Sequence, residues 1–260
     1  MTAPLPMPND GVRQRQQQIA ANIRALILSG DLMPGDKLPS TTELMAEYNV
    51  ANQTVQRALN ILKNEKFIES HKGKGIFVAA RAPQVVRAGH YPVAPAQGQP
   101  YPWITDHANQ GRRGSSDLIS VGETPAPAQV AAAFGIDKGT AVVTRHQLLK
   151  LDGEPAELVW LYYPVEIARG TPLAEQKKFT GGSPRVLADL GFPQRGAIDQ
   201  VGTRLATVEE FVALELPEDM PVLRTFRVVF TDDQRPVEVQ VMVKAGQQYE
   251  VQYRLSENGD

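Results

Sequence analysis

The sequence contains no cysteine, which excludes disulfide bonds, thiolate zinc sites and a cysteine nucleophile and suits a reducing compartment. No apolar run approaches the roughly 18–20 residues needed to cross a bilayer. The first sixteen residues also lack the apolar segment of a secretory signal. The four histidines are His71, His90, His107 and His146, and no two of them have the spacing of metal ligands. We therefore expect a cytoplasmic protein with no metal, cofactor or membrane partner.

Motifs of known catalytic chemistry are also missing. There is no G-x-S-x-G, phosphate-binding loop or dinucleotide fingerprint. Glu154, Glu157 and Glu238 lie near predicted strands, but carboxylates on strand edges are most often solvated. The sequence therefore predicts no catalytic residue and no enzyme.

What is present is an ordinary globular composition, with 42% hydrophobic and 22% charged residues. A length of 260 residues suits two domains. The net charge of −2 is unevenly spread: residues 1–80 hold nine Lys/Arg and seven Asp/Glu, and residues 81–260 hold eighteen and twenty-two. This mild asymmetry does not by itself identify a DNA-binding protein, so the motifs must decide.

The first eighty residues have the element order of a winged helix. Apolar spacing predicts helices over about 13–29 and 52–64, and the capping box Ser40-Thr41-Thr42-Glu43 opens another helix between them. Short apolar runs at 67–68 and 76–78 flank a basic, glycine-rich segment and predict a hairpin. We therefore predict that residues 12–79 form a winged helix-turn-helix, preceded by a disordered Pro-rich segment, 1–11.

The outer face of the third predicted helix is suited to reading base edges in the major groove. Asn and Gln side chains can bind adenine and Arg can bind guanine. The hairpin tip adds Lys72 and Lys74 beside the phosphates, and Gly73 permits close backbone approach. An amphipathic helix with a merely solvated face is the alternative. The side chains of this face that we predict to contact DNA are Asn52, Gln53, Gln56 and Arg57.

Residues 15–79 resemble the GntR-type winged-helix regulators. The resemblance rests, in order, on Pro34–Ser40, Leu44, Tyr48, Val50, Thr54-Val55, Arg57-Ala58-Leu59, Leu62 and Gly73–Val78. It implies DNA contacts from the start of the second helix, the start of the third helix and the hairpin. To the candidate DNA-binding residues it adds Ser40, Thr41, Thr42 and Thr54.

The same segment departs from the family pattern at several positions expected to lie at DNA. Thr41-Thr42 replaces the usual Glu-Arg, Ala51-Asn52 replaces Ser-Arg, and Gln56 replaces an Arg. Fewer cations should weaken phosphate attraction and increase the reliance on Asn and Gln contacts. We expect an unusual operator sequence rather than lost DNA binding.

The rest of the chain predicts a linker followed by an α+β domain. Residues 80–102 are rich in Pro, Ala, Gly and Gln, which is typical of a linker. Over 103–256, strands alternate with a few helices, which predicts a mainly antiparallel sheet. Strands are expected near 117–122, 141–151, 156–163, 222–230, 236–244 and 248–254, and helices near 128–134, 184–190 and 207–214. The Asp152-Gly153 turn indicates a hairpin.

This second region resembles the UTRA effector domain of the HutC-like regulators, which shares the fold of chorismate lyase. The matching order is Asp117–Gly122, Gly139-Thr140, Arg145, Asp152–Pro155, Tyr162–Pro164 and Arg235–Glu238. The resemblance implies a small, anionic effector, because Arg and Lys pair with anions and Glu with hydroxyls. The candidate effector-binding residues are Arg145, Tyr162, Ser183, Arg195, Glu238 and Lys244.

Two features of the predicted effector site point away from a sugar phosphate. Gln147 and Leu149 stand where sugar-phosphate sensors often carry Arg. Four aromatic side chains would suit a more apolar or aromatic ligand, although such side chains are more often core: Trp103, Trp160, Tyr162 and Tyr163.

The leading interpretation is a repressor that binds a palindromic operator as a homodimer and is released by its effector. One alternative is a repressor of a mobile element or of plasmid transfer genes that has no metabolite effector. The other is an enzyme that retains lyase-type chemistry. We expect double-stranded DNA, a small molecule and a second copy of the chain as partners.

Overall fold

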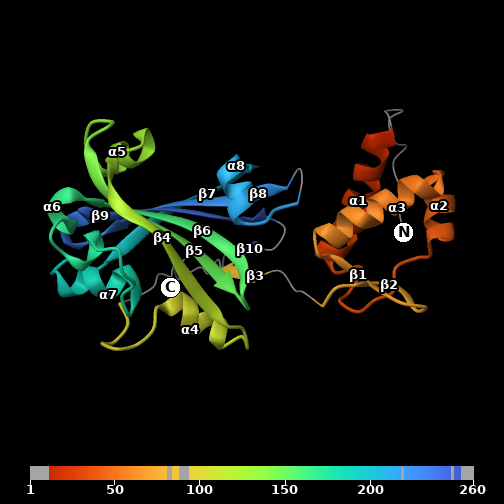
Figure 1. The fold of residues 1–260 in the computed structure, drawn as a ribbon, viewed down its shortest axis with the longest axis horizontal. Helices are drawn as coiled ribbons and strands as arrows, with labels where there is room; N and C mark the ends of the chain where they lie inside the picture. Colours follow the sequence, from red (N-terminus) through yellow and green to blue (C-terminus); the bar gives the residue numbers. More distant parts are fainter. Residues whose placement is uncertain (1–11, 81–83, 88–93, 218–219, 247–248, 253–260) are drawn as a thin grey trace, which may run out of the picture. The chain divides into compact units, whose positions relative to one another are not determined.

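A computed structural model describes residues 12–80, 84–87, 94–217, 220–246 and 249–252. Contacts divide the chain into two compact units, residues 1–82 and 83–260 (Figure 1). Each unit has its own hydrophobic core. The predicted disordered segment 1–11 and the last four residues of the predicted effector domain lie outside the described residues. Within the described part of the chain, no helix is long and apolar enough to cross a membrane.

The first unit contains three helices followed by a hairpin, in the predicted order. Its elements are α1 (Val12–Ser29), α2 (Thr41–Tyr48), α3 (Asn52–Asn64), β1 (Ile68–His71) and β2 (Gly75–Val78). The predicted capping box is present: the Glu43 amide donates to Ser40 Oγ at 3.3 Å, and the Ser40 amide donates to Glu43 Oε2 at 2.7 Å. Asn49 ends α2 in the left-handed region, at φ 49°.

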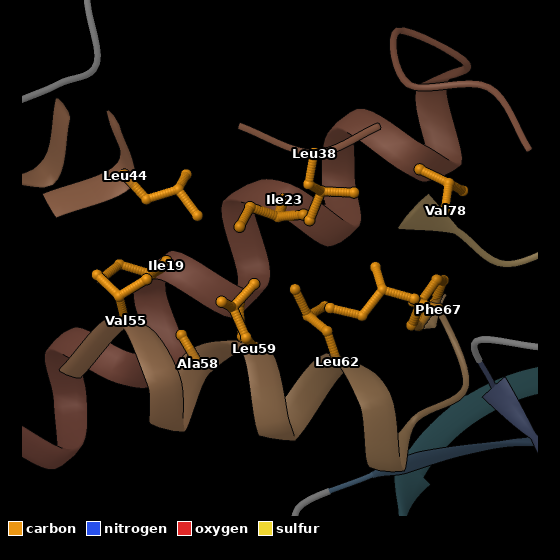
Figure 2. Packing of buried hydrophobic residues seen from close by; sticks show 12 residues of the cluster. Ile19, Ile23, Leu38, Leu44, Val55, Ala58, Leu59, Leu62, Phe67 and Val78 are labelled. Carbon is orange, nitrogen blue, oxygen red and sulfur yellow. The ribbon is translucent and has the colours of Figure 1, made fainter. Parts of the chain in front are cut away.

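The core of this unit fixes the orientation of α3. Ile19 and Ile23 of α1 and Leu44 of α2 pack against it (Figure 2). Four α3 residues spaced for one helical face are at most 1% exposed: Val55, Ala58, Leu59 and Leu62. Because this face is held by the core, the opposite face of α3 is turned outward.

The second unit is built on a six-stranded antiparallel sheet, and the α+β class is as predicted. The strand order is β4-β5-β6-β9-β8-β7. Asp152 and Gly153 form the tight β5–β6 turn, both with positive φ, as a two-residue hairpin turn requires. The strands are β4 (Gly114–Pro125), β5 (Ala141–Leu151), β6 (Glu154–Pro164), β7 (Gly196–Leu205), β8 (Pro221–Phe230) and β9 (Pro236–Ala245).

Helices cover both faces of the sheet (Figure 1). One face packs on α5 (Ala128–Phe134) and on the segment that follows α8 (Val208–Ala213), and we call it the α5 face. The other face packs on α7 (Gly182–Asp189) and its neighbours, and we call it the α7 face. The neighbours are α4 (Pro102–Ala108), α6 (Val165–Ala168) and the 3-10 turn η1 (Pro172–Ala174), while a second such turn, η2 (Asp232–Gln234), joins β8 to β9.

Besides the short α6, η1 and η2, the elements β7, β3 and α4 were not predicted from the sequence. The edge strand β7 has no buried residue along its length, so it lacks the alternation that marks a half-buried strand. Inside the predicted linker, β3 (Gln84–Arg87) pairs in parallel with β10 (Tyr249–Gln252), a partner more than 160 residues away in the chain. The short helix α4 also begins at the predicted boundary, with proline in its first turn.

Candidate DNA-binding surface and effector site

The outward face of α3 carries the polar side chains selected from the sequence. Asn52, Gln53, Gln56 and Arg57 are all exposed, and Asn60 continues the same face one turn further along. The N-cap, Ala51, has no side chain to accept from the first backbone amides of α3. These amides and the positive end of the helix dipole favour a phosphate near this end of α3.

The start of α2 lies against this same face. Gln56 Nε2 donates to Thr41 Oγ1 at 3.3 Å, which joins the two helices through residues that were both candidates for DNA contact. Ser40 and Thr42 are exposed beside it. The structure therefore gathers the candidates of α2 and α3 onto one surface.

Thr54 is the exception among the α3 candidates. Its side chain is 7% exposed and shares the inner face of α3 with Val55 and Ala58. A period of 3.6 residues places position 54 on the core side when 58 and 62 are on that side. We therefore correct the assignment: Thr54 packs inside the unit, and its side chain does not reach the outer face.

The hairpin places its basic tip in solvent. Lys72, Gly73 and Lys74 are all exposed, and Gly73 has φ 74°, a conformation that side chains rarely adopt. At the base of the tip, Gly75 has φ 120°, and a Cβ there would lie 2.7 Å from Lys37 Cε. Two lysines on a glycine turn are well placed to follow a phosphate backbone.

In the second unit, strand register brings three effector candidates to the same face of the sheet. Arg145 pairs with Leu161 on β6, Leu161 pairs with Gln240 on β9, and Gln240 lies two positions from Glu238. Because side chains alternate along a strand, Arg145, Glu238 and Lys244 all lie on the α7 face. Ser183, near the start of α7, is buried against the same face.

Arg145 is already occupied by the backbone of its own unit. Its Nη1 donates to the carbonyls of Leu173 at 3.0 Å and Glu175 at 2.8 Å, and its Nη2 donates to that of Lys177 at 2.7 Å. The guanidinium also lies 4.4 Å from the ring centroid of Phe179. Arg145 thus holds the segment after η1 onto the sheet, a structural role that the sequence did not indicate.

The other cations of the α7 face are paired as well. Lys244 Nζ lies 3.2 Å from Glu157 Oε1, and both side chains are almost fully buried. Arg227 donates to Asp199 through Nε at 2.6 Å and Nη2 at 2.7 Å. An incoming anion would have to compete with a carbonyl or a carboxylate for each of these cations.

Glu238 is a buried acid on this face, and polar side chains contact it. It is 0% exposed, and its Oε1 accepts from Gln240 Nε2. The Ser183 and Tyr163 hydroxyls lie beside the same carboxyl group, close enough to hydrogen-bond it. Burial raises the pKa of Glu238, against the hydrogen bonds with Ser183 and Gln240, the charge of Arg227 and the hydrogen bond with Tyr163.

Two tyrosines, Tyr163 and Tyr101, lie close to Glu238. Burial, and then the charge of Glu238, raise the pKa of the Tyr163 hydroxyl, while Arg145 opposes the rise. Burial and the charges of Glu238 and Glu157 also raise the pKa of Tyr101. The Tyr101 ring packs so closely on Gly182 that a Cβ at that position would overlap it. Tyr163 was named from the sequence only among the aromatic side chains that would suit an apolar ligand, and Tyr101 was not named at all.

Two effector candidates are placed elsewhere. Tyr162 lies on the α5 face, packed with Val130 and Phe226, because it is one residue out of phase with Tyr163. Arg195 is exposed, and its Nε donates to Asp232 Oδ1 at 2.8 Å. Neither is part of the group around Glu238, which corrects the set drawn from the sequence.

The described residues hold no group of three or more His, Asp or Glu side chains that could bind a metal ion. His146 stacks on Trp160, with ring centroids 4.5 Å apart. Trp160 therefore lies on the α5 face with His146, whereas Trp103 packs on the α7 face.

Two family models match the chain, one for each unit. Residues 15–78 match the model described as bacterial regulatory proteins, gntR family, and residues 109–250 match the UTRA domain. The second match alone covers more than half of the chain.

Individual relatives agree with these models. An uncharacterised HTH-type transcriptional regulator of Streptomyces coelicolor is 28% identical over 244 residues, covering 91% of each chain. The mannosyl-D-glycerate transport/metabolism system repressor MngR of Escherichia coli is 40% identical over 68 residues, which is 26% of this chain and 28% of that one. The crystal structure of PhnF from Mycobacterium smegmatis has the same fold, with a TM-score of 0.59 and 20% identity over 92% of this chain and 99% of that chain.

Proposed function

Since the chain belongs to the GntR family of bacterial regulatory proteins, with a UTRA domain of the HutC-like branch, we propose that it is an effector-released repressor that binds its operator as a homodimer. It is a transcriptional regulator and not an enzyme.

The observation that carries the DNA-binding part is the two-sided character of α3. One side is held by the core through four residues at most 1% exposed, and the other presents Asn52, Gln53, Gln56 and Arg57. Side chains of these types read adenine and guanine edges, each good bidentate pair contributing about 1–3 kcal/mol of discrimination. The exposed Lys72 and Lys74 would add sequence-independent attraction to phosphates.

We propose that a ligand bound in the second unit releases the protein from its operator. A UTRA domain is an effector-binding domain, and its α7 face contains buried polar groups, including Ser183 and Glu238. A ligand there would act on DNA binding if it bound the DNA-incompetent arrangement more tightly. A coupling of about 1–3 kcal/mol corresponds to roughly 5–150-fold in operator affinity.

A homodimer is supported by an apolar surface along one edge of the sheet. Beside β8, β7 has no second strand partner among the described residues, so its outer backbone groups offer an edge for another chain. Six apolar side chains of β7 and α8 are between 38% and 82% exposed: Ile198, Val201, Leu205, Val208, Phe211 and Val212. A surface of this kind favours contact with a second copy.

DNA binding is tested with the duplex upstream of the protein's own gene. We expect Gln56→Ala and Arg57→Ala each to weaken binding to that duplex by about 5–150-fold and to leave binding to unrelated DNA nearly unchanged. Gln176→Ala, at an exposed glutamine of the second unit, is the matched control. Equal affinity of the wild-type protein for the upstream and unrelated duplexes, even at low salt, would refute the proposal.

A second candidate is a repressor of a mobile element or of plasmid transfer genes that needs no metabolite. The observation that favours it is the occupied state of Arg145, whose guanidinium is bound by backbone carbonyls. This candidate expects operator binding that no small molecule alters.

A further inference from the structure

The hydrogen bond between the start of α2 and the outer face of α3 restricts how Gln56 can meet a base. Gln56 is exposed in the N-terminal half of α3, and its Nε2 donates to Thr41 Oγ1 at 3.3 Å. We propose that Thr41 is a positioning residue that makes Gln56 select adenine over guanine at one base pair in each half of the operator. This inference rests on the proposed function, because it names the base that the same DNA-binding surface reads.

Thr41 has a fixed position relative to α3. It is half-buried and is the first residue of α2, directly after the capping residue Ser40. One turn later, Leu44 is 2% exposed and packs in the same core as Val55, the neighbour of Gln56 on α3 (Figure 2). The threonine side chain is short, and β-branching restricts its rotation. The Thr41 hydroxyl is therefore held at a defined place beside the Gln56 amide.

A free glutamine amide could pair with either purine. It carries one acceptor, its oxygen, and two N–H donors. In the major groove guanine presents two acceptors, N7 and O6, whereas adenine presents the acceptor N7 and the N6 amino donor. With one N–H of Gln56 held by Thr41, the second N–H and Oε1 remain for the base. One donor beside one acceptor matches adenine.

The same hydrogen bond disfavours guanine. To give both donors to guanine, Gln56 must leave Thr41 and lose that hydrogen bond. To keep Thr41, it must set its own oxygen against O6, which places two acceptors face to face without a proton between them. Thymine presents a single acceptor and cytosine a single donor, so neither can form the paired contact. Thr41 thus adds discrimination between bases without contacting a base itself.

The proposal is tested by selection of bound duplexes from a random-sequence pool with the full-length protein. The base pair of interest is the one whose preference Gln56→Ala abolishes. Fluorescence anisotropy then measures affinity for two duplexes that differ only by A·T or G·C at that base pair. We expect the wild-type protein to prefer the adenine duplex by about 5–150-fold, the discrimination of a good bidentate contact.

Variants of Thr41 separate positioning from a contact with DNA. Thr41→Val and Thr41→Ala lack the hydroxyl and should each reduce the preference for adenine by about 2–12-fold, the net effect of one hydrogen bond. Thr41→Ser keeps the hydroxyl and should keep the preference, as should Thr140→Val, at an exposed threonine of the second unit. In a Gln56→Ala background, Thr41→Val should have no further effect on the choice between the two duplexes, because the two residues act as one unit.

Several outcomes overturn the proposal. One is an unchanged preference in both Thr41→Val and Thr41→Ala, and another is a preference for a base other than adenine at this base pair. A third is the absence of any base pair whose preference depends on Gln56. Equal weakening of the two duplexes by the Thr41 variants also overturns it and makes Thr41 a contact to the DNA backbone.

Failure of the inference and failure of the proposed function give different results. The inference fails in these ways while the wild-type protein still enriches one sequence from the pool. The proposed function fails when the wild-type protein enriches no sequence and binds all duplexes alike.

Discussion

Arg24 of α1 binds Glu65, the residue after α3, at two points: Nε donates to Oε2 at 2.8 Å and Nη2 donates to Oε1 at 2.6 Å. The Glu65 side chain is only 4% exposed, and the Arg24 guanidinium lies 5.8 Å from the ring centroid of Phe67. This pair joins the two helices that form the core of the DNA-binding unit. The orientation of the α3 outer face therefore depends partly on an ion pair between two residues that are 41 positions apart in the sequence.

Removing Arg24 should destabilise the first unit. Arg24→Ala leaves the carboxylate of Glu65 buried without its cation, so we expect the free energy of unfolding to fall by about 1–3 kcal/mol. Circular dichroism during urea unfolding measures the loss. Arg57→Ala, an exposed arginine of the same unit, should change it by less than about 0.5 kcal/mol. Equal effects of the two variants would contradict a structural role for the pair.

The same variant has a pH signature. Burial raises the pKa of Glu65, and Arg24 opposes the rise, so Arg24→Ala should raise the pKa of Glu65 further. An acid with a raised folded-state pKa stabilises the fold at pH values below its unfolded pKa, and that stability is lost as pH increases through the folded value. The deficit of Arg24→Ala should thus be larger at pH 8 than at pH 5.

The two lysines at the hairpin tip should affect how strongly salt weakens DNA binding. Lys72 and Lys74 are exposed at the hairpin tip, where each would neutralise one phosphate. Each alanine variant should reduce the slope of log affinity against log salt by about one and weaken specific and unrelated duplexes alike. Fluorescence anisotropy over a salt series measures the slope. If the slope of log affinity against log salt is unchanged in both variants, the hairpin tip does not contact DNA.

The sequence predicted the first unit closely because its signals are local. Ser40 and Glu43 form a cap within one turn, and the apolar spacing of 52–64 gives both the limits and the inner face of α3. Thr54 was misplaced because the family pattern does not say whether a matching residue contacts DNA or supports the helix. Its position in the helical period, next to Val55, could have shown that it is buried.

The arrangement of the effector candidates was harder to predict, because it depends on contacts between residues far apart in the sequence. Arg145 donates to backbone carbonyls about thirty residues away. Every residue has a backbone carbonyl, so the residue types in the sequence do not reveal these contacts. Whether Tyr162 or Tyr163 lies on the α7 face depends on the phase of β6 relative to β9, and a change of one residue exchanges the two faces. The edge strand β7 is exposed on both faces and so had no pattern to find.

Arg145 connects β5 to the segment after η1 through three backbone carbonyls. If it mainly holds the segment after η1, Arg145→Ala should lower the free energy of unfolding of the second unit by about 3 kcal/mol. Both tryptophans of the chain lie in this unit, so their fluorescence reports its unfolding alone. Arg195→Ala, which breaks an exposed ion pair, should cost less than about 1 kcal/mol. A stable Arg145→Ala protein would mean that the carbonyl contacts contribute little.

The dimer can be tested at the two edges of the sheet. Ile198 and Leu205 of β7 are 58% and 69% exposed, and Ile119 on the opposite edge strand, β4, is 48% exposed. We expect the double variant Ile198→Glu/Leu205→Glu to be monomeric in light scattering, because a dimer would bury its charges. Ile119→Glu is the matched control and should stay dimeric. If only Ile119→Glu is monomeric, the dimer interface lies at β4 and not at β7.

Glu238 should weaken the fold at neutral pH if it serves a ligand rather than the core. Because burial raises its pKa, its stabilising contribution is present only below its unfolded pKa of about 4.3 and is lost as pH increases through the folded value. Glu238→Gln keeps the shape without the charge, so it should raise the melting temperature at pH 8 and match the wild type near pH 4. Glu157→Gln, whose carboxylate pairs with the buried Lys244, should lower the melting temperature at pH 8. A Glu238→Gln protein that melts earlier than the wild type at pH 8 would make Glu238 a structural residue.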